Sequence, residues 1–414
     1  MDIVQLTSKS MKELRNQRLN IMKGMIEGQE GSLLVLSGAF TGANRQHHTV
    51  SYAVFSIFYE LWERFSMESW SYTFDKEGLM FYIKLEEDAL KIKEVLVHYE
   101  DFHPLGFAIE SDVLSKDQLI TRDLIGFNPR LETFTKNPLE SELDGVNEDP
   151  KYALNFIKKI ESEIVQGDRQ TILSNIMVYS YVTAFTKPLG FGMYGPNYRG
   201  SNDQMNFEKL IHLVRAYKME VLNIFNYNSN RIEDVIAFQN KVESKISHAV
   251  LNQQSYKYTV LMSSMVMFAF INSRGYADIS KQVRALSAVL EDKGVFEGEG
   301  KRYDITKNGM RELFNYTVPF FQKNKTVEST LLYLLSRHKD DSILLHNGEQ
   351  NLLKVQFLAK NLMLKEDKWI EMNKFCTSSY IYPHDSTQLM VVVAMLDLFQ
   401  RNYLKIKMMF DRNK

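Results

Sequence analysis

The pattern of apolar residues changes once along this chain, at a turn-rich segment spanning residues 128–149. Before that segment, alternating apolar and polar residues predict strands, which are interspersed with segments of helical spacing. From Pro150 onward, helical spacing recurs in one segment after another. A mixture of strands and helices is typical of an α+β domain. We therefore predict a multi-domain protein, with an α+β domain at residues 1–148 followed by an all-α helical domain at residues 149–414.

The individual elements follow from the same patterns. In the first domain, helices are expected at residues 5–31, 52–64 and 87–100, and strands at residues 32–40, 70–75, 80–84, 108–114 and 119–124. In the second domain, helices are expected at residues 151–165, 169–184, 208–225, 232–251, 256–272, 281–290, 309–322, 327–336, 351–363, 369–375 and 387–405.

The composition is that of an ordinary soluble globular protein. The 414 residues carry a formal net charge of −1, with 24% charged and 44% hydrophobic residues, so nothing favours a nucleic-acid partner. The lone cysteine, Cys376, excludes an intrachain disulfide framework and fits a reducing compartment. No secretion signal is apparent, and the apolar runs at 258–271 and 389–399 are too short to span a bilayer. We expect a cytoplasmic protein that does not associate with a membrane.

Two carboxylates, Glu110 and Asp112, lie two residues apart in an expected strand. Alternation along the strand places them on one face, with Ser111 on the other. Such a pair can hold a divalent cation or orient a hydroxyl group for attack. The alternative is a solvated strand face. Farther along, Arg122 and Arg130 could bind phosphate through their planar guanidinium groups, although isolated arginines commonly lie on an ordinary surface.

The long loop at residues 183–207 is rich in glycine and proline, which permit unusual backbone conformations and interrupt helices. Its two basic residues, Lys187 and Arg199, favour an anion-binding loop over a plain linker. Gly190 and Gly200 would allow the backbone of this loop to approach the ligand closely.

A second loop, at residues 42–48, lies between an expected strand and an expected helix. Its backbone amides could surround an anion at the helix N-terminus. Its adjacent residues His47 and His48 do not face the same way on a helix or strand, and no third ligand is suitably spaced, so we reject a metal site there.

In the helical domain, Asp340 and Asp341 lie at an expected helix end and could ligate Mg²⁺ bound to a nucleoside triphosphate. The alternative is a charged turn between helices. Asn347 lies in the turn that follows and is a candidate nucleotide-binding residue. Lys257 lies within an apolar run, so its side chain either extends to the rim of the protein or points into a site as a phosphate partner.

Several motif residues recur in order in the first domain: His103-Pro-Leu-Gly106, Glu110, Asp112-Val113, Thr121-Arg122 and Arg130, with Gly42 and Arg45 upstream. Through them the domain resembles the citrate lyase holo-acyl-carrier-protein synthases, which are phosphoribosyl-dephospho-CoA transferases. In that family Gly42 and Arg45 would fall near the glycine and lysine of a turn. Phe107 departs from the family motif, in which an arginine follows His-Pro-Leu-Gly.

A second set of motif residues occurs in the helical domain: Thr186-Lys187-Pro188, Gly190, Gly200-Ser201-Asn202, Met205, Lys257, Asp340-Asp341-Ser342, Pro383, Ser386 and Thr387. Their order and spacing resemble the all-helical triphosphoribosyl-dephospho-CoA synthases. Asn202, Gln204 and Gln388 replace one histidine and two aspartates of that family.

The two resemblances together imply a bifunctional transferase. The helical domain would join dephospho-CoA to the ribose of ATP and release adenine. Lys187 and Lys257 would neutralise phosphates, Asp340 and Asp341 would hold Mg²⁺, and the glycine-rich loop would close over the nucleotide.

The first domain would then transfer the phosphoribosyl-dephospho-CoA group to a serine of the citrate lyase acyl carrier protein, releasing pyrophosphate. Asp112 with Glu110 would hold the metal or activate the serine hydroxyl, and Arg45, Arg122 and Arg130 would bind phosphates. The replaced carboxylates favour an alternative, a degenerate paralogue that keeps the two-domain fold and binds a nucleotide or a carrier protein without turnover.

Overall fold

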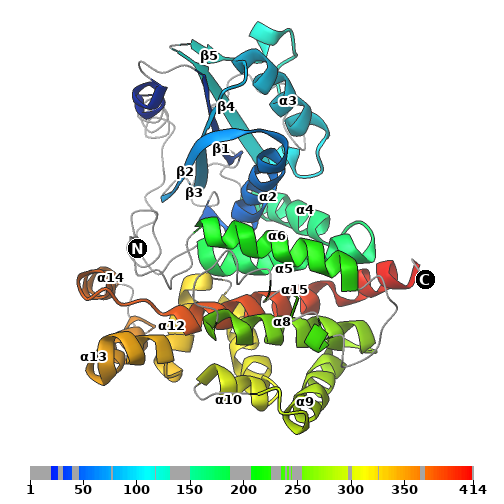
Figure 1. The fold of residues 1–414 in the computed structure, drawn as a ribbon, viewed down its shortest axis with the longest axis vertical. Helices are drawn as coiled ribbons and strands as arrows, with labels where there is room; N and C mark the ends of the chain where they lie inside the picture. Colours follow the sequence, from blue (N-terminus) through cyan, green and yellow to red (C-terminus); the bar gives the residue numbers. More distant parts are fainter. Residues whose placement is uncertain are drawn as a thin grey trace. The chain divides into compact units, whose positions relative to one another are not determined.

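A computed structural model describes residues 20–26, 31–39, 46–75, 78–116, 118–130, 150–186, 207–224, 235–237, 240–241, 244, 254–296, 301–324, 326–363 and 369–412 (Figure 1). The chain forms two compact units, Met1–Glu163 and Ile164–Lys414, which we describe separately. The first contains a sheet with helices, and the described elements of the second are helical, which confirms the predicted multi-domain layout. The predicted boundary after residue 148 adjoins residues outside the described ranges and stays a prediction.

The first unit is built on an antiparallel sheet with strand order β2-β3-β1-β4-β5. Leucine and valine dominate the central strand β1, whose residues are all buried. The last four predicted strands form two antiparallel hairpins, β2 with β3 and β4 with β5. The strands are β1 (Ser32–Gly38), β2 (Met67–Asp75), β3 (Gly78–Leu85), β4 (Ile109–Ser115) and β5 (Gln118–Ile120).

The predicted strand at residues 119–124 is wrong beyond Ile120. A 3₁₀ turn, η3 (Asp123–Ile125), follows it. The turn ends at Gly126, whose φ of 77° is readily adopted only by glycine. β5 therefore pairs only with residues 113–115 of β4.

Two helices pack against one face of the sheet, α2 (His48–Arg64) against β1 and β3, and α3 (Ala89–Phe102) against β4 (Figure 1). Phe58 of α2 stacks on Phe81 of β3 with ring centroids 3.8 Å apart. α3 begins at Asp88, whose carboxylate accepts hydrogen bonds from the first free amides of the helix. Burial of these aromatic and aliphatic side chains is the main force that holds the helices to the sheet.

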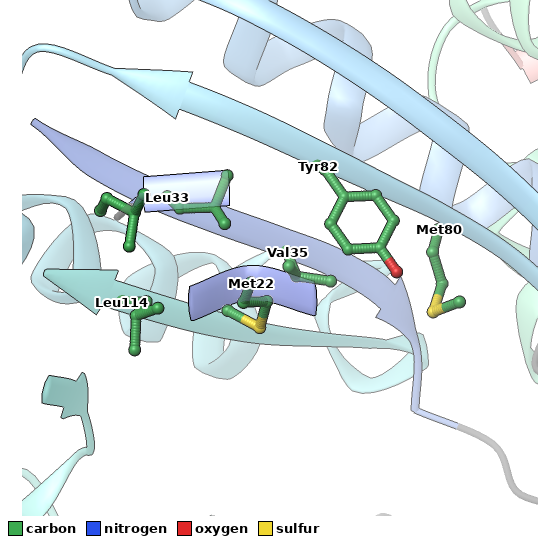
Figure 2. Packing of buried hydrophobic residues seen from close by; sticks show 7 residues of the cluster. Met22, Leu33, Val35, Met80, Tyr82 and Leu114 are labelled. Atoms are coloured by element: carbon green, nitrogen blue, oxygen red, sulfur yellow. The ribbon is translucent and has the colours of Figure 1, made fainter. Parts of the chain in front are cut away.

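The opposite face of the sheet is covered in part by the helical residues 20–26. Their buried side chains lie over β1, β3 and β4, as Figure 2 shows. The remainder of the predicted helix at residues 5–31 lies outside the described residues. The cluster consists of Met22, Ile26, Leu33, Val35, Met80, Tyr82 and Leu114.

The second unit is arranged around its last helix, whose residues 384–399 are all buried. This helix, α15, contacts α5, α8, α11, α12 and α13. No helix of the described ranges has an apolar stretch long enough to cross a bilayer. The helix that precedes this unit in sequence, α4 (Pro150–Ile164), belongs to the first unit up to Glu163. The helices of the second unit are α5 (Arg169–Thr186), α6 (Phe207–Ile224), α8 (Gln254–Asn272), α9 (Tyr276–Asp292), α10 (Lys301–Lys307), α11 (Val318–Asn324), α12 (Val327–Arg337), α13 (Asp341–Leu362), α14 (Trp369–Ser378) and α15 (His384–Arg412).

The predicted helix at residues 309–322 is confirmed from residue 311 onward, but it starts two residues later and is not a regular α-helix throughout. Gly309 and Met310 both have positive φ, so the chain turns before a π-helical segment at Leu313–Thr317. The regular helix resumes only at α11. Pro319 follows the π-helical segment and is consistent with it, because proline lacks the amide proton that would continue an α-helical hydrogen-bond pattern from the preceding turn.

Candidate functional site

The turn between α3 and β4 is formed by the predicted motif residues His103-Pro-Leu-Gly106. The amide of Gly106 donates to the carbonyl of His103 at 2.8 Å, which folds the turn back over the end of α3. A Cβ atom on Gly106 would collide with the carbonyl oxygens of Tyr99 and Glu100. Glycine is therefore required at this position because two backbone segments meet without space for a side chain.

We predict that Gly106→Ala destabilises the first unit by about 1–3 kcal/mol, since the backbone must shift to admit a methyl group. Urea denaturation followed by tryptophan fluorescence measures the effect, because Trp62 and Trp70 both belong to this unit. Gly24→Ala is the control, since its Cβ would meet nothing within 4 Å. Equal denaturation midpoints for the two variants would contradict the prediction.

His103 fixes the same turn through both ring nitrogens. Its Nδ1 accepts from the amide of Leu105 at 3.0 Å, and its Nε2 lies 3.3 Å from a carboxylate oxygen of Glu60 on α2. The imidazole thereby ties the end of α3 to α2. Beyond the turn, the ammonium nitrogen of Lys159 lies 3.9 Å from the centre of the Phe107 ring. A cation therefore lies near Phe107, the residue that departs from the expected arginine.

Glu110 and Asp112 lie on β4, beside the C-terminal end of β1. Glu110 is opposite Ser37 and Asp112 is opposite Val35 in the register of the two strands. Their side chains share one face, as predicted, while Ser111 reaches α3 from the other face. Asp112 is only 6% exposed and Glu110 is half-buried, so a solvated strand face does not describe Asp112.

The N-terminus of α2 is capped by the residue that precedes it. The Nδ1 atom of His47 accepts a hydrogen bond from the amide of Thr49 at 3.3 Å and so caps α2, and the ring of His47 stacks on that of His48. Residues 40–45, including Arg45, lie outside the described residues, so the proposed anion-binding loop is described only at its end.

A buried charge network that we did not predict lies behind Ser111. Glu100 of α3 accepts from the amide of Ser111 at 3.1 Å and from its hydroxyl at 2.5 Å. Arg122 donates to Glu100 at 2.7 and 3.2 Å and also pairs with Asp101 at 2.8 Å. Burial alone would raise the pKa of Glu100, but the charges of Lys93, Arg130 and Arg122 and the hydroxyl of Ser111 hold that pKa below its usual value.

Both predicted phosphate-binding arginines of the described chain therefore contact protein groups. Arg122 binds the two carboxylates of α3, and Arg130 donates to the carbonyls of Ile109 at 2.5 Å and Gly106 at 2.9 Å. Both lie next to the part of β4 that carries Glu110, Arg130 through the carbonyl of Ile109 and Arg122 through Glu100, which binds Ser111. Their phosphate-binding role stays a prediction, and a substrate phosphate would have to share or displace these partners.

In the second unit, the N-terminal ends of α13 and α15 cap one another. Asp340, just before α13, accepts from the amide and the hydroxyl of Ser386 on α15, both at 2.9 Å. Asp385 of α15 accepts from the amides of Asp341 at 2.9 Å and Ser342 at 3.3 Å. Each carboxylate thus satisfies amides that the other helix leaves unbonded in its first turn.

The predicted metal ligands Asp340 and Asp341 lie at this junction. Asp340 is fully buried, and its other oxygen accepts from the amide of Ile343, so both carboxylate oxygens already serve as caps. Burial, with the neighbouring charge of Asp385 adding to it, raises the pKa of Asp340 to about 7. The described residues contain no group of three or more His, Cys, Asp or Glu side chains that could hold a metal.

Other predicted residues of this unit are spread over separate elements. Asn347 donates to the carbonyls of Ser379 at 3.2 Å and Tyr380 at 3.4 Å, beyond the end of α14. Gln388 accepts from the hydroxyl of Thr259 on α8 at 2.5 Å, within the buried part of α15. Lys257 lies on α8, but its side chain is outside the described set, as are the loop residues Lys187, Gly190, Arg199 and Gly200.

Comparison with known proteins bears on the first unit alone. No curated protein matches the chain. Residues 6–131 match the family model of the apo-citrate lyase phosphoribosyl-dephospho-CoA transferases. The matched segment contains the His103–Gly106 turn, both carboxylates of β4, Arg122 and Arg130. The N-terminal part of the chain is therefore similar to a family of transferases that act in the formation of the citrate lyase prosthetic group.

Proposed function

We propose that the N-terminal unit transfers a phosphoribosyl-dephospho-CoA group to a serine of the citrate lyase acyl carrier protein. The observation that carries the proposal is the pair Glu110 and Asp112, which lie on one sheet face within the segment that matches the transferase family. A carboxylate next to a hydroxyl can accept its proton as the oxygen attacks, which is the role of a general base.

In the proposed reaction, the serine oxygen attacks the phosphorus atom nearest the ribose of the triphosphate donor. A serine O–P bond forms, the bond to the outgoing pyrophosphate breaks, and Asp112 accepts the hydroxyl proton. Arg45, Arg122 and Arg130 are the cations that would stabilise the phosphate charges, since guanidinium groups bind phosphate in two-pronged fashion.

The donor set also suits Mg²⁺, which is commonly held by one or two carboxylates together with substrate phosphates. Glu110 and Asp112 are the two residues that would hold it. When bound, the ion would neutralise charge on the leaving pyrophosphate.

The intact mass of an apo acyl carrier subunit tests the transfer directly. The subunit is incubated with this protein, Mg²⁺ and triphosphoribosyl-dephospho-CoA, so that the result does not depend on synthesis of the donor. We expect a mass increase equal to the phosphoribosyl-dephospho-CoA group. No increase, while an active homologue modifies the same subunit, would reject the proposal.

For the C-terminal unit, two hypotheses remain: synthesis of the donor from ATP and dephospho-CoA with Mg²⁺, or a degenerate unit that binds ligand without turnover. The reciprocal capping by Asp340 and Asp385 favours the second, because both oxygens of Asp340, one of the two predicted ligands, already accept helix amides. The two hypotheses are distinguished by incubating the protein with ATP, dephospho-CoA and Mg²⁺ and measuring by chromatography whether adenine is released from ATP. Adenine release would support a bifunctional transferase, whereas its absence beside intact transfer from supplied donor would support the degenerate unit.

A further inference from the structure

The outer edge of β4 is closed by charged side chains where the sheet has no further strand. β5 pairs only with Val113, Leu114 and Ser115. The segment of β4 that precedes them carries Glu110 and Asp112, and β1 pairs with it on one side only. Backbone groups on its other side need different partners, since unpaired buried amides and carbonyls cost free energy.

Those partners are ionised side chains, chiefly from α3. The amide of Ser111 donates to Glu100 at 3.1 Å, and the carbonyl of Ser111 accepts from the ammonium group of Lys93 at 2.6 Å. The carbonyl of Ile109 accepts from Arg130 at 2.5 Å. Hydrogen bonds to charged groups are stronger than those between neutral ones, so these side chains can satisfy the backbone groups that no further strand pairs.

Glu100 is itself held in place from several sides. Its second oxygen is bound by Arg122, and its first oxygen takes both the amide and the hydroxyl of Ser111. The side chains of Glu100 and Lys93 are both buried, so water cannot readily replace either of them. Glu100 and Lys93 carry opposite charges, and Arg122 pairs with both Glu100 and Asp101, so these buried charges have partners of opposite sign.

We infer that Glu100 and Lys93 are positioning residues for the transfer reaction. By fixing both backbone groups of Ser111 they set the pleat of β4, and the side chains on either side of Ser111 must then project from the opposite face. Those side chains are Glu110 and Asp112. The inference rests on the proposed function, in which these two carboxylates take part in the transfer. Their placement matters for the rate, because a misplacement of about 1 Å in a reacting group can lower a rate by about 100-fold.

The test compares Glu100→Gln with Glu94→Gln, an exposed glutamate on the same helix. Transfer kinetics are measured with supplied donor, and amide hydrogen exchange is measured along β4. For Glu100→Gln we expect kcat to fall about 10- to 100-fold with both KM values nearly unchanged. The amides of residues 109–112 should exchange faster, while those of β3 do not. Glu94→Gln should behave as wild type in both measurements.

A second comparison separates positioning from general damage to the fold. In an Asp112→Asn background, Glu100→Gln should lower the residual kcat by less than about threefold, because residues that act as a unit are strongly non-additive. An equal loss in both backgrounds, or no loss in either, overturns the inference. If Glu100→Gln does not fold, Lys93→Met is used instead, because it removes the hydrogen bond to the carbonyl of Ser111.

Failure of the proposed function would be recognised separately. Wild-type protein that transfers nothing would reject the function, whereas the exchange rates of residues 109–112 would still show whether Glu100 holds β4. Unchanged exchange in Glu100→Gln, with active wild-type enzyme, would reject the positioning role alone.

Discussion

Asp112→Asn is expected to lower the rate of carrier modification by about 100- to 10,000-fold, the range typical for loss of a general base. Asparagine is nearly the same size as aspartate but cannot accept a proton at neutral pH. Asp112 is only 6% exposed and lies opposite Val35 of β1, so the substitution changes its chemistry with little change in packing. Intact-mass time courses with supplied donor give the rate.

The control for this prediction is Glu86→Gln, which removes a carboxylate from an exposed position after β3. It should leave the rate within about twofold of wild type, since surface substitutions far from a site have small effects. Circular dichroism of both variants establishes that the fold is retained. A folded Asp112→Asn variant with full activity would falsify the assignment of Asp112 as the base, and Glu110 would become the candidate to test.

Local patterns were sufficient for most elements of the fold. Alternation predicted that Glu110 and Asp112 share a face, and helical spacing predicted segments such as α12 within a few residues of their observed bounds. The failures occurred where local propensity was overridden, as at Gly309 with Met310, whose positive φ values interrupt a strongly helical pattern.

The candidate site was predictable only in part, because the charged side chains that hold β4 come from residues distant in the sequence. Nothing near Glu100 in sequence indicates that it will bind Ser111 across the end of β4, since that contact requires the α3–β4 turn to form first. Asp340 posed the opposite problem. Adjacent aspartates at a helix end suit a metal site and a helix cap equally well, and only the position of Ser386 distinguishes the two. An aspartate in the first turn of α15 was a signal that could have identified Asp385.

Stability of the helical unit should depend on pH through Asp340. Its pKa in the folded protein is about 7, well above the ordinary value of 3.8, because burial and the charge of Asp385 disfavour ionisation. A raised carboxyl pKa means that the folded state binds the proton more tightly than the unfolded chain does. Its contribution to stability is therefore complete below about pH 4 and is lost as pH rises through 7.

Between pH 4 and pH 8 this loss amounts to roughly 2–4 kcal/mol of unfolding free energy for a shift of this size. Asp340→Asn removes the titration but keeps an oxygen that can accept from Ser386. The variant should therefore lose less stability than wild type over that pH range. Urea denaturation followed by helical circular dichroism at each pH measures the difference in unfolding free energy between wild type and the variant.

The same variants separate the capping role of Asp340 from a role as metal ligand. A cap contributes stability without metal, so Mg²⁺ should leave the urea midpoints of wild type and Asp340→Asn equally unchanged. Asp340→Ala removes every cap oxygen and leaves buried amides unbonded, so it should destabilise the helical unit, and by more at pH 4 than at pH 8 because it also removes the titrating carboxyl group. A rise in midpoint with Mg²⁺ that occurs in wild type alone would instead make Asp340 a ligand, since an ion that binds only the folded state stabilises it by mass action.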